Sequence, residues 1–264
     1  MSPSGKVHGP RPADSAGVGW EGRDLTAQPF AGDDGSASSP VAAALAELAA
    51  ARSAQPATDP DVALRAQAAV VAALAGTRLL VPIVAVLGEG GEAVAAEGDR
   101  NAEMALVTLI GRDGRRALPA FTSVATCALW DPAARPVPAR AERAAAAALE
   151  EGFDVVVLDP GGPVTLVLGR QAVRALGSGC AWTPAPFDDA VRAAVVGAVT
   201  GLPAVLSAQC EAGRSAETGV VLTLTPGLTR AQLDDVVARA GERLAASDVV
   251  ADRVDSIELR LVSG

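Results

Sequence analysis

Hydrophobic residues recur at helical spacing in some segments of the chain and form short uninterrupted runs in others. The run at 78–87, RLLVPIVAVL, is apolar on both faces and too short for an amphipathic helix, so it predicts a buried strand. Pro82 within this run lacks an N–H and is expected at a bulge or an unpaired edge position. Before the run, Asp59 and Pro60 suit the N-cap and first turn of a helix that reaches about Ala75.

The other patterns predict helices and strands in irregular order. Helices are expected at 41–52, 123–130, 139–151, 170–176, 187–200 and 229–246, and strands at 103–110, 115–121, 153–159, 163–169, 202–210, 219–225 and 254–262. The turns GRDG and PGG predict one hairpin each, and 131–138 is expected to be a loop. Because strict β-α-β alternation is absent, we expect the α+β class, with mainly antiparallel or mixed sheets flanked by helices.

Composition along the chain predicts a tail followed by two domains. The expected parts are a disordered tail at 1–39, an α+β domain at 40–177, a linker at 178–186 and a smaller α-β-β-α-β domain at 187–264. The tail is rich in small and polar residues that bury too little surface to offset chain entropy. Trp20 and Phe30 within it are either short recognition anchors or aromatic residues without a role.

Charge and cysteine content limit the partners and the compartment. The net charge of −9 argues against direct binding to nucleic acid, and it suits either simple solubility or a basic protein partner. No apolar stretch reaches the roughly 20 residues of a membrane span, so we expect a soluble protein without a membrane partner. Cys127, Cys180 and Cys210 are odd in number and far apart, which predicts free thiols in the cytoplasm.

Several catalytic chemistries lack their usual residues. The single histidine is His8 and the single lysine is Lys6, both inside the predicted tail, and the chain has no tyrosine. This placement argues against Ser-His-Asp and Cys-His catalysis, a Schiff-base lysine and a P-loop lysine. The sequence also lacks the spacings of zinc sites. We therefore expect a protein that is not an enzyme, with no catalytic residues, cofactor or metal.

Two motifs suggest chemistry but have simpler structural explanations. The run at 88–93, GEGGEA, fits the dinucleotide pattern G-x-G-x-x-A, yet the next strand follows too soon for a crossover helix. Glu89 and Glu92 would also repel a pyrophosphate, so a loop between strands is expected. Asp188-Asp189 and Asp234-Asp235 lie in the first turns of predicted helices, where carboxylates stabilise exposed amides.

A family resemblance depends on several short runs between Leu79 and Leu176. They are Val81-Pro82, the run from Gly114 to Ser123, Trp130, Val137-Pro138 and the run from Leu158 to Gly161. This segment resembles the SseB amino-terminal domain family, which is enhanced serine sensitivity protein-like, in its actinobacterial form. The last part of the chain is loosely similar to the carboxy-terminal domain of that protein. Family members commonly have Asn at the position of Asp159.

The resemblance implies little about chemistry, because the family has no agreed catalytic residues and no known cofactor. Its genes often neighbour translation genes, which implies a translation-linked protein partner. The candidate partner or ligand surface consists of residues in and around the family's most recognisable run: Arg115, Arg116, Phe121, Thr122, Ser123 and Trp130. A structural interpretation is equally concrete, since Ser123 can cap the helix that follows and Phe121 can pack on the sheet.

Function is reached only as a class. The leading hypothesis is a non-catalytic interaction or regulatory protein of uncharacterised role, whose domains present a protein-binding surface. The alternative is a small anionic-metabolite sensor or a carboxylate enzyme, in which Arg115 and Arg116 act with the hydroxyls of Thr122 and Ser123. Exposed amides at the start of the helix would then help Arg116 to bind an anion. A scaffold for a homo-oligomer is a third possibility.

Overall fold

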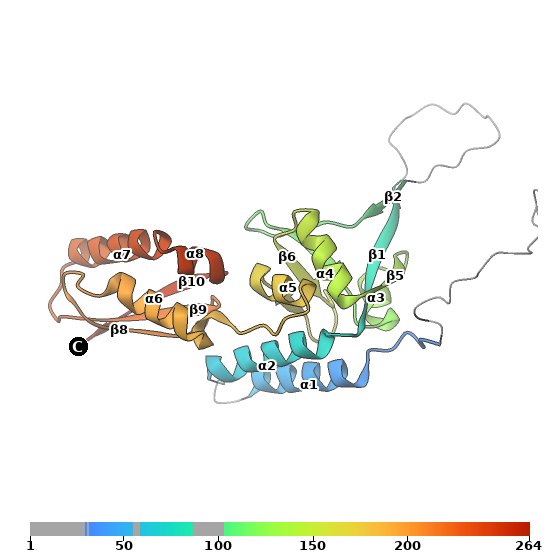
Figure 1. Ribbon diagram of the computed structural model, residues 1–264, viewed down its shortest axis with the longest axis horizontal. Coiled ribbons are helices and arrows are strands. Elements are labelled where there is room, and N and C mark those ends of the chain that lie inside the picture. Colours follow the sequence, from blue (N-terminus) through green and yellow to red (C-terminus); the bar gives the residue numbers. More distant parts are fainter. Residues whose placement is uncertain (1–29, 31, 55–58, 87–102) are drawn as a thin grey trace, which may run out of the picture. The chain divides into compact units, whose positions relative to one another are not determined.

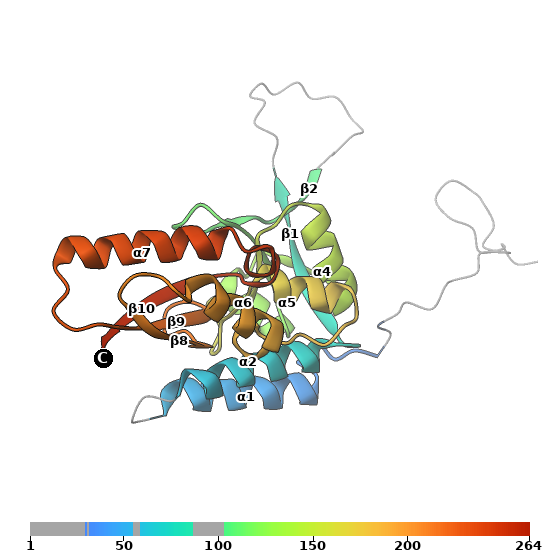
Figure 2. The same cartoon turned by 60° about the vertical axis from the view of Figure 1, so that its left-hand side comes forward.

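A computed structural model describes residues 30, 32–54, 59–86 and 103–264 of the chain (Figures 1 and 2). Residues Gly35–Gly264 form one compact unit. Its helices and its mixed and antiparallel sheets confirm the α+β class. Trp20, His8, Lys6 and the run at 88–93 lie outside the described residues. The predicted division into domains stays a prediction, but the hydrophobic residues form separate cores before and after residue 178.

The part before residue 178, called the amino-terminal module, combines helices with two sheets. Its helices are α1 (Ser39–Ser53), α2 (Pro60–Leu74), α3 (Val124–Trp130), α4 (Ala141–Glu150) and α5 (Arg170–Gly177). One sheet has the order β2 (Glu103–Leu106), β1 (Arg78–Val86), β5 (Arg135–Arg140). The other has the order β3 (Leu109–Ile110), β4 (Arg116–Ala120), β6 (Val155–Leu158), β7 (Leu166–Leu168), in which β4 and β6 are parallel.

Strand β5 corrects the expected loop at 131–138 and shows how a proline-rich strand is accommodated. Pro136 and Pro138 face Pro82 and Leu80 of β1 in the antiparallel pair. Leu80 exchanges both of its backbone hydrogen bonds with Phe121 on its other side, at 2.8 Å each. By alternation, the prolines occupy positions of β5 that need no N–H toward β1. Pro82 pairs with Pro136 without a register shift, which excludes the expected bulge, and on its other side β1 pairs with β2 only from Ile83.

The expected strand at 103–110 divides between the two sheets. Glu103–Leu106 pair with β1, whereas only Leu109 and Ile110 pair with β4. The hydrophobic pattern could not reveal this division, because either pairing satisfies the same alternation of side chains. The second predicted hairpin is confirmed, since β6 and β7 pair antiparallel.

Small side chains let the helices of the amino-terminal module pack closely. Helix α4 buries Ala141, Ala144, Ala145 and Ala148 in the core. A Cβ at Gly177, at the end of α5, would lie 3.0 Å from the backbone nitrogen of Ala146. The core is thus assembled from many small contacts, as the alanine-rich composition indicates.

The part from residue 185 onward, called the carboxy-terminal module, has a three-stranded sheet. Its elements are the short 3-10 helix η1 (Ala185–Phe187), α6 (Asp189–Val199), β8 (Val205–Ala212), β9 (Thr218–Leu224), α7 (Arg230–Ala245), α8 (Asp248–Arg253) and β10 (Ile257–Ser263). The sheet order is β10-β9-β8, with β10 parallel and β8 antiparallel to β9. The expected α-β-β-α-β order is present, with α8 added before the last strand.

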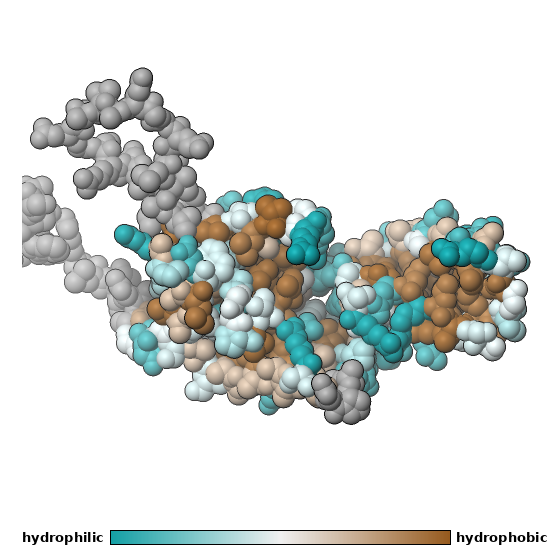
Figure 3. All heavy atoms as spheres, turned by 180° about the vertical axis from the view of Figure 1, so that it is seen from behind, coloured by the Kyte–Doolittle hydropathy of each residue, from teal (hydrophilic) through white to brown (hydrophobic). Residues whose placement is uncertain are grey.

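The two faces of this sheet differ in burial. Val220, Leu222 and Leu224 of β9 alternate into the core formed with the helices. Elsewhere in the sheet, Leu206 is 59% exposed and Val262 is 47% exposed. Hydrophobic residues gather on this module when it is seen from behind (Figure 3). The carboxy-terminal module therefore leaves an apolar surface exposed.

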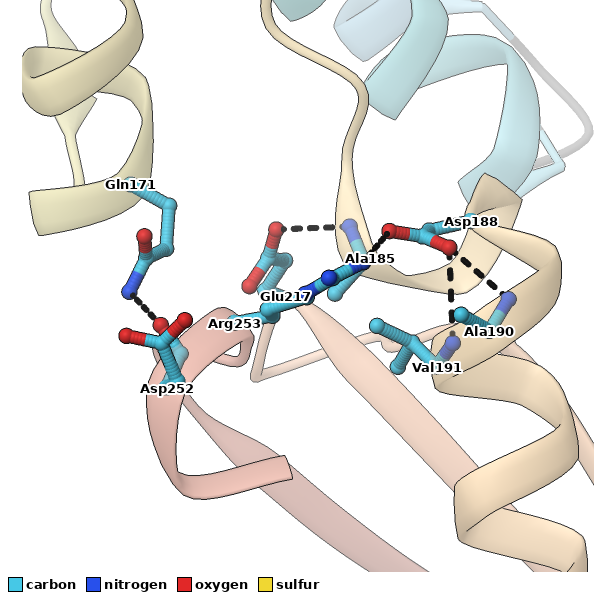
Figure 4. Close-up of polar contacts among 8 residues, drawn as sticks. All are labelled: Gln171, Ala185, Asp188, Ala190, Val191, Glu217, Asp252 and Arg253. Atoms are coloured by element: carbon cyan, nitrogen blue, oxygen red, sulfur yellow. Dashed lines mark hydrogen bonds and ion pairs between the residues drawn. The ribbon is translucent and has the colours of Figure 1, made fainter. Parts of the chain in front are cut away.

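Carboxylates and amides connect the two modules. The Gln171 side chain donates to the Asp252 carbonyl at 2.6 Å (Figure 4), and Arg174 pairs with the Asp252 carboxylate at 3.1 Å. Asp255 accepts from the backbone N–H of Gln171 at 3.2 Å, within the first turn of α5. The module contact thus supplies a carboxylate to amides that lack partners within the helix.

Substitution of Gly169 tests the contact between Asp255 and the start of α5. A Cβ at Gly169 would overlap the carboxylate of Asp255, whereas a Cβ at Gly241 in α7 meets nothing within 4 Å. We expect Gly169→Ala to lower the free energy of unfolding by roughly 1–3 kcal/mol. We expect Gly241→Ala to raise it by up to about 1 kcal/mol, because alanine restricts the unfolded chain. Urea denaturation measures both; equal effects of the two substitutions would contradict the close approach of Asp255.

Candidate functional site

The most recognisable sequence run surrounds a buried carboxylate. The Asp159 side chain lies at the end of β6, and the residue is only 2% exposed. Its Oδ1 accepts from the backbone N–H of Thr122 at 2.8 Å and from the Thr126 hydroxyl at 2.7 Å. Its Oδ2 accepts from the Thr122 hydroxyl at 2.7 Å. These bonds tie the start of α3 to the turn that follows β6.

The backbone of Asp159 forms the turn itself. Its φ of 48° lies in the left-handed region, which Asp and Asn tolerate better than most side chains. Its N–H donates to the Ala120 carbonyl at 2.8 Å, and its carbonyl accepts from Gly162 N–H at 3.0 Å. Asp159 therefore forms the turn that follows β6.

Ser123 and Phe121 have the structural roles that the sequence allowed. Ser123 is the N-cap of α3, and its hydroxyl accepts from Thr126 N–H at 3.1 Å in a capping box. Phe121 is fully buried beside Cys127, and its ring centroid lies 5.5 Å from that of the half-buried Trp130. Both the expected cap and the expected packing are confirmed.

Arg115 and Arg116 lie at the opposite end of β4 from these residues. At roughly 3.3 Å per strand residue, the backbone separates Arg115 from Thr122 by about 20 Å. Arg116 donates to the Glu151 carbonyl at 3.2 Å, and its guanidinium lies 5.0 Å from the centre of the Phe153 ring. The structure thus groups Phe121, Thr122, Ser123 and Trp130 and does not bring the arginines to them.

Arg115 instead lines a large cleft between the two modules. This intermodule cleft has a volume of about 1590 Å³. Its walls are the end of α1, the start of α2, the turn between β8 and β9, and residues at the start of β10, with Arg115 and Trp182 completing the lining. Pattern analysis missed the cleft, because its residues come from distant segments and carry no common motif.

Two carboxylates in the cleft wall are largely desolvated. Burial raises the pKa of Glu217, even though its carboxylate accepts from the backbone N–H groups of Ala185 and Asp255 at 3.1 and 3.0 Å. Burial likewise raises the pKa of Asp255, against the lowering effect of its hydrogen bond from Gln171 and of the nearby Arg115 charge. The carboxylates of both residues thus accept hydrogen bonds from backbone N–H groups.

Four guanidinium groups also line the cleft. Arg52 donates to the Thr165 carbonyl at 2.8 Å, and Arg115 Nε pairs with Asp113 at 2.6 Å. Arg260 pairs with Glu211, while its buried Nε has no partner among the described residues. The guanidinium of Arg214 is exposed, and the structure records no bond to it from the described residues. Unused donors therefore remain on both sides of the cleft.

The cysteine thiols differ in their surroundings. Burial raises the pKa of Cys210 to about 11, and it also raises the pKa of Cys127. Both thiols are thus held in the protonated, less nucleophilic form near neutral pH. Cys180 is exposed, and all three cysteines are free. In the described part of the chain, no group of three or more His, Cys, Asp or Glu side chains has an arrangement that could hold a metal ion.

These features define a two-module α+β protein in which the run Phe121-Thr122-Ser123 connects β4 to α3 and a cleft lies between the modules. Residues 41–175 match the family described as the SseB protein N-terminal domain, and the chain belongs to this family. The match includes α1 and α2, which the sequence resemblance did not cover. No curated protein and no solved structure matched the chain. None of the helices in the described residues is long and apolar enough to cross a membrane.

The hydrogen bonds of Asp159 predict that two substitutions at this position differ in their effect on the free energy of unfolding. Asp159→Ala leaves Thr122 N–H and its hydroxyl buried without an acceptor, so we expect a loss of roughly 3 kcal/mol in the free energy of unfolding. In Asp159→Asn, Oδ1 can still accept from Thr122 N–H, and the Thr122 hydroxyl can rotate to accept from the amide. We expect this change to cost about 1 kcal/mol or less. Chemical denaturation compares them, and equal losses would contradict the proposed geometry.

The raised pKa of Glu217 predicts that the free energy of unfolding depends on pH. Its folded pKa is raised, so its contribution to stability is present below the usual value of 4.5 and is lost as the pH rises through the folded pKa. Relative to wild type, Glu217→Gln should therefore gain stability as the pH rises, by about 1.4 kcal/mol for each unit by which the pKa is raised. Urea denaturation across this pH range measures the difference.

Glu258 is the control for this titration. Hydrogen bonds from Arg214 and Ser215 lower its pKa, so its contribution is present above the usual value and lost as the pH falls. Glu258→Gln should therefore change the pH dependence in the opposite direction. A pH dependence of the same sign for both variants would show that desolvation does not govern Glu217.

Proposed function

We propose that this protein is a non-catalytic interaction or regulatory protein that holds part of a partner protein in the intermodule cleft. The single observation that carries the proposal is the cleft itself. Its volume of about 1590 Å³ exceeds the roughly 300–1,000 Å³ of a small-molecule site, and both modules contribute to its walls. A site of this size suits a length of polypeptide.

The placement of the potentially reactive groups also supports a binding role. Asp159, Glu217 and Asp255 each accept hydrogen bonds from backbone N–H groups, which gives these carboxylates a structural role. A general base needs a carboxylate or imidazole that can reach a substrate proton. Cys127 and Cys210 have raised pKa values, which disfavour the thiolate that a cysteine nucleophile requires.

A small anionic-metabolite sensor is the second candidate, because Arg115 lines the cleft. In this version Arg115 acts with other cleft arginines rather than with Arg116, Thr122 and Ser123. The hydroxyls of Thr122 and Ser123 are already hydrogen-bonded, to Asp159 and Thr126 respectively. This candidate predicts that a small anion alone binds as well as a peptide does.

The setting of the interaction is part of the proposal. We infer a cytoplasmic location from the three free cysteines, and a translation-linked partner from the SseB-like run around Phe121. The same run supports the actinobacterial form of the family. A homo-oligomer would place a second copy of the chain in the role of partner.

Partner enrichment from native lysate tests the proposal. The tagged wild-type chain should recover a reproducible protein partner by mass spectrometry. Ala63→Trp places a large ring in the cleft and should reduce recovery about tenfold, because it excludes the bound segment. The matched control is Ala69→Trp, which alters an exposed position of the same helix outside the cleft and should recover the partner normally.

Two outcomes would contradict the proposal. One is that no partner is recovered reproducibly by the wild-type chain. The other is that Ala63→Trp and Ala69→Trp recover the partner equally well. Thermal denaturation shows beforehand that both variants are folded.

A further inference from the structure

We propose that the intermodule cleft binds an acidic segment of the partner protein, through carboxylates that accept hydrogen bonds from its arginines. This inference rests on the proposed function and adds the chemistry of the partner. It is counterintuitive for a protein with a net charge of −9, and it follows from the local balance of donors and acceptors.

The four carboxylates that line the cleft, Asp59, Glu211, Glu217 and Asp255, each already accept a hydrogen bond or pair with an arginine within the protein. The Glu217 oxygens accept from the N–H groups of Ala185 and Asp255, and both oxygens of Asp255 lie 3.2 Å from the Gln171 nitrogen. Glu211 pairs with Arg260. A basic segment entering the cleft would have to compete with these bonds, and losing them would leave backbone amides without partners.

The donors of the cleft are not occupied to the same extent. A guanidinium carries five N–H donors, and Arg115 has one recorded side-chain partner, Asp113. The guanidinium of Arg214 has no recorded partner among the described residues. Trp182 and Arg260 each have a buried donor nitrogen without an acceptor in the described part of the chain. The exposed donors, those of Arg115 and Arg214, favour a ligand that supplies acceptors.

Carboxylates fit these donors better than neutral acceptors do. Guanidinium groups bind carboxylates through two parallel hydrogen bonds, and such charged bonds are roughly twice as strong as neutral ones. Arg115 comes from the amino-terminal module and Arg214 from the turn between β8 and β9. A single carboxylate cannot fill a cleft of about 1590 Å³, whereas successive acidic residues of a peptide can contact both walls.

The test is binding of a fluorescein-labelled hexaglutamate peptide to the full chain, measured by fluorescence anisotropy. Hexaglutamate should bind, hexalysine with the same label should not, and added salt should weaken the binding. Arg214→Gln should weaken binding about fivefold, and a further Arg115→Gln substitution should weaken it again.

The matched control is Arg239→Gln, since Arg239 lies on α7 outside the cleft and pairs with Asp235. This variant should bind hexaglutamate like the wild type. Equal weakening by Arg214→Gln and Arg239→Gln, or equal binding of hexalysine, would overturn the inference. Displacement of hexaglutamate by inorganic phosphate at the same concentration of anionic groups would also overturn it, in favour of a small-anion site.

Failure of this inference is distinguishable from failure of the proposed function. If the wild type and Arg214→Gln recover the same partner from lysate, the protein binds a partner without the acidic recognition proposed here. If the wild type recovers no partner while hexaglutamate still binds through Arg214, the cleft chemistry is correct and the interaction role is wrong.

Discussion

Backbone amides that lack partners within their own helix or strand govern this structure, and carboxylates satisfy many of them. Asp159 accepts from Thr122 N–H at the joint between β4 and α3. Asp255 reaches the first turn of α5, and Glu217 accepts from Ala185 just after the modules separate. An unsatisfied buried amide costs roughly 1–3 kcal/mol. Each of these carboxylates therefore helps to hold a helix or turn in its position.

The same bonds decide what chemistry remains. A carboxylate that holds backbone amides cannot rotate away from them without leaving those N–H groups unpaired. Arginines are less constrained, because one guanidinium has more donors than its neighbours use. The free hydrogen-bonding capacity of the cleft, illustrated by Arg214, is consequently a capacity to bind anionic groups.

Local rules succeeded where one segment determines its own structure. The cap at Ser123, the N-cap at Asp59 and the hairpin of β6 and β7 all depend on residues within a few positions of one another. Sequence reasoning failed where pairing depends on distant strands. Pro136 and Pro138 predicted a loop, but they fit β5 because Leu80 directs its hydrogen bonds to Phe121 instead. That choice is made by the isolated bridge to Phe121, a residue from another segment that the local pattern does not contain.

The candidate site shows the same limit in a sharper form. The sequence identified Arg115 and the run around Thr122 together, yet only Arg115 faces the cleft, since its walls come from segments joined by tertiary contacts. This origin has a thermodynamic consequence. An acidic ligand that contacts both Arg115 and Arg214 would stabilise the contact between the modules, and by linkage a firmer contact would raise the affinity for that ligand. Binding and module association are then one coupled equilibrium, with Asp255 at the contact and the arginines at the ligand.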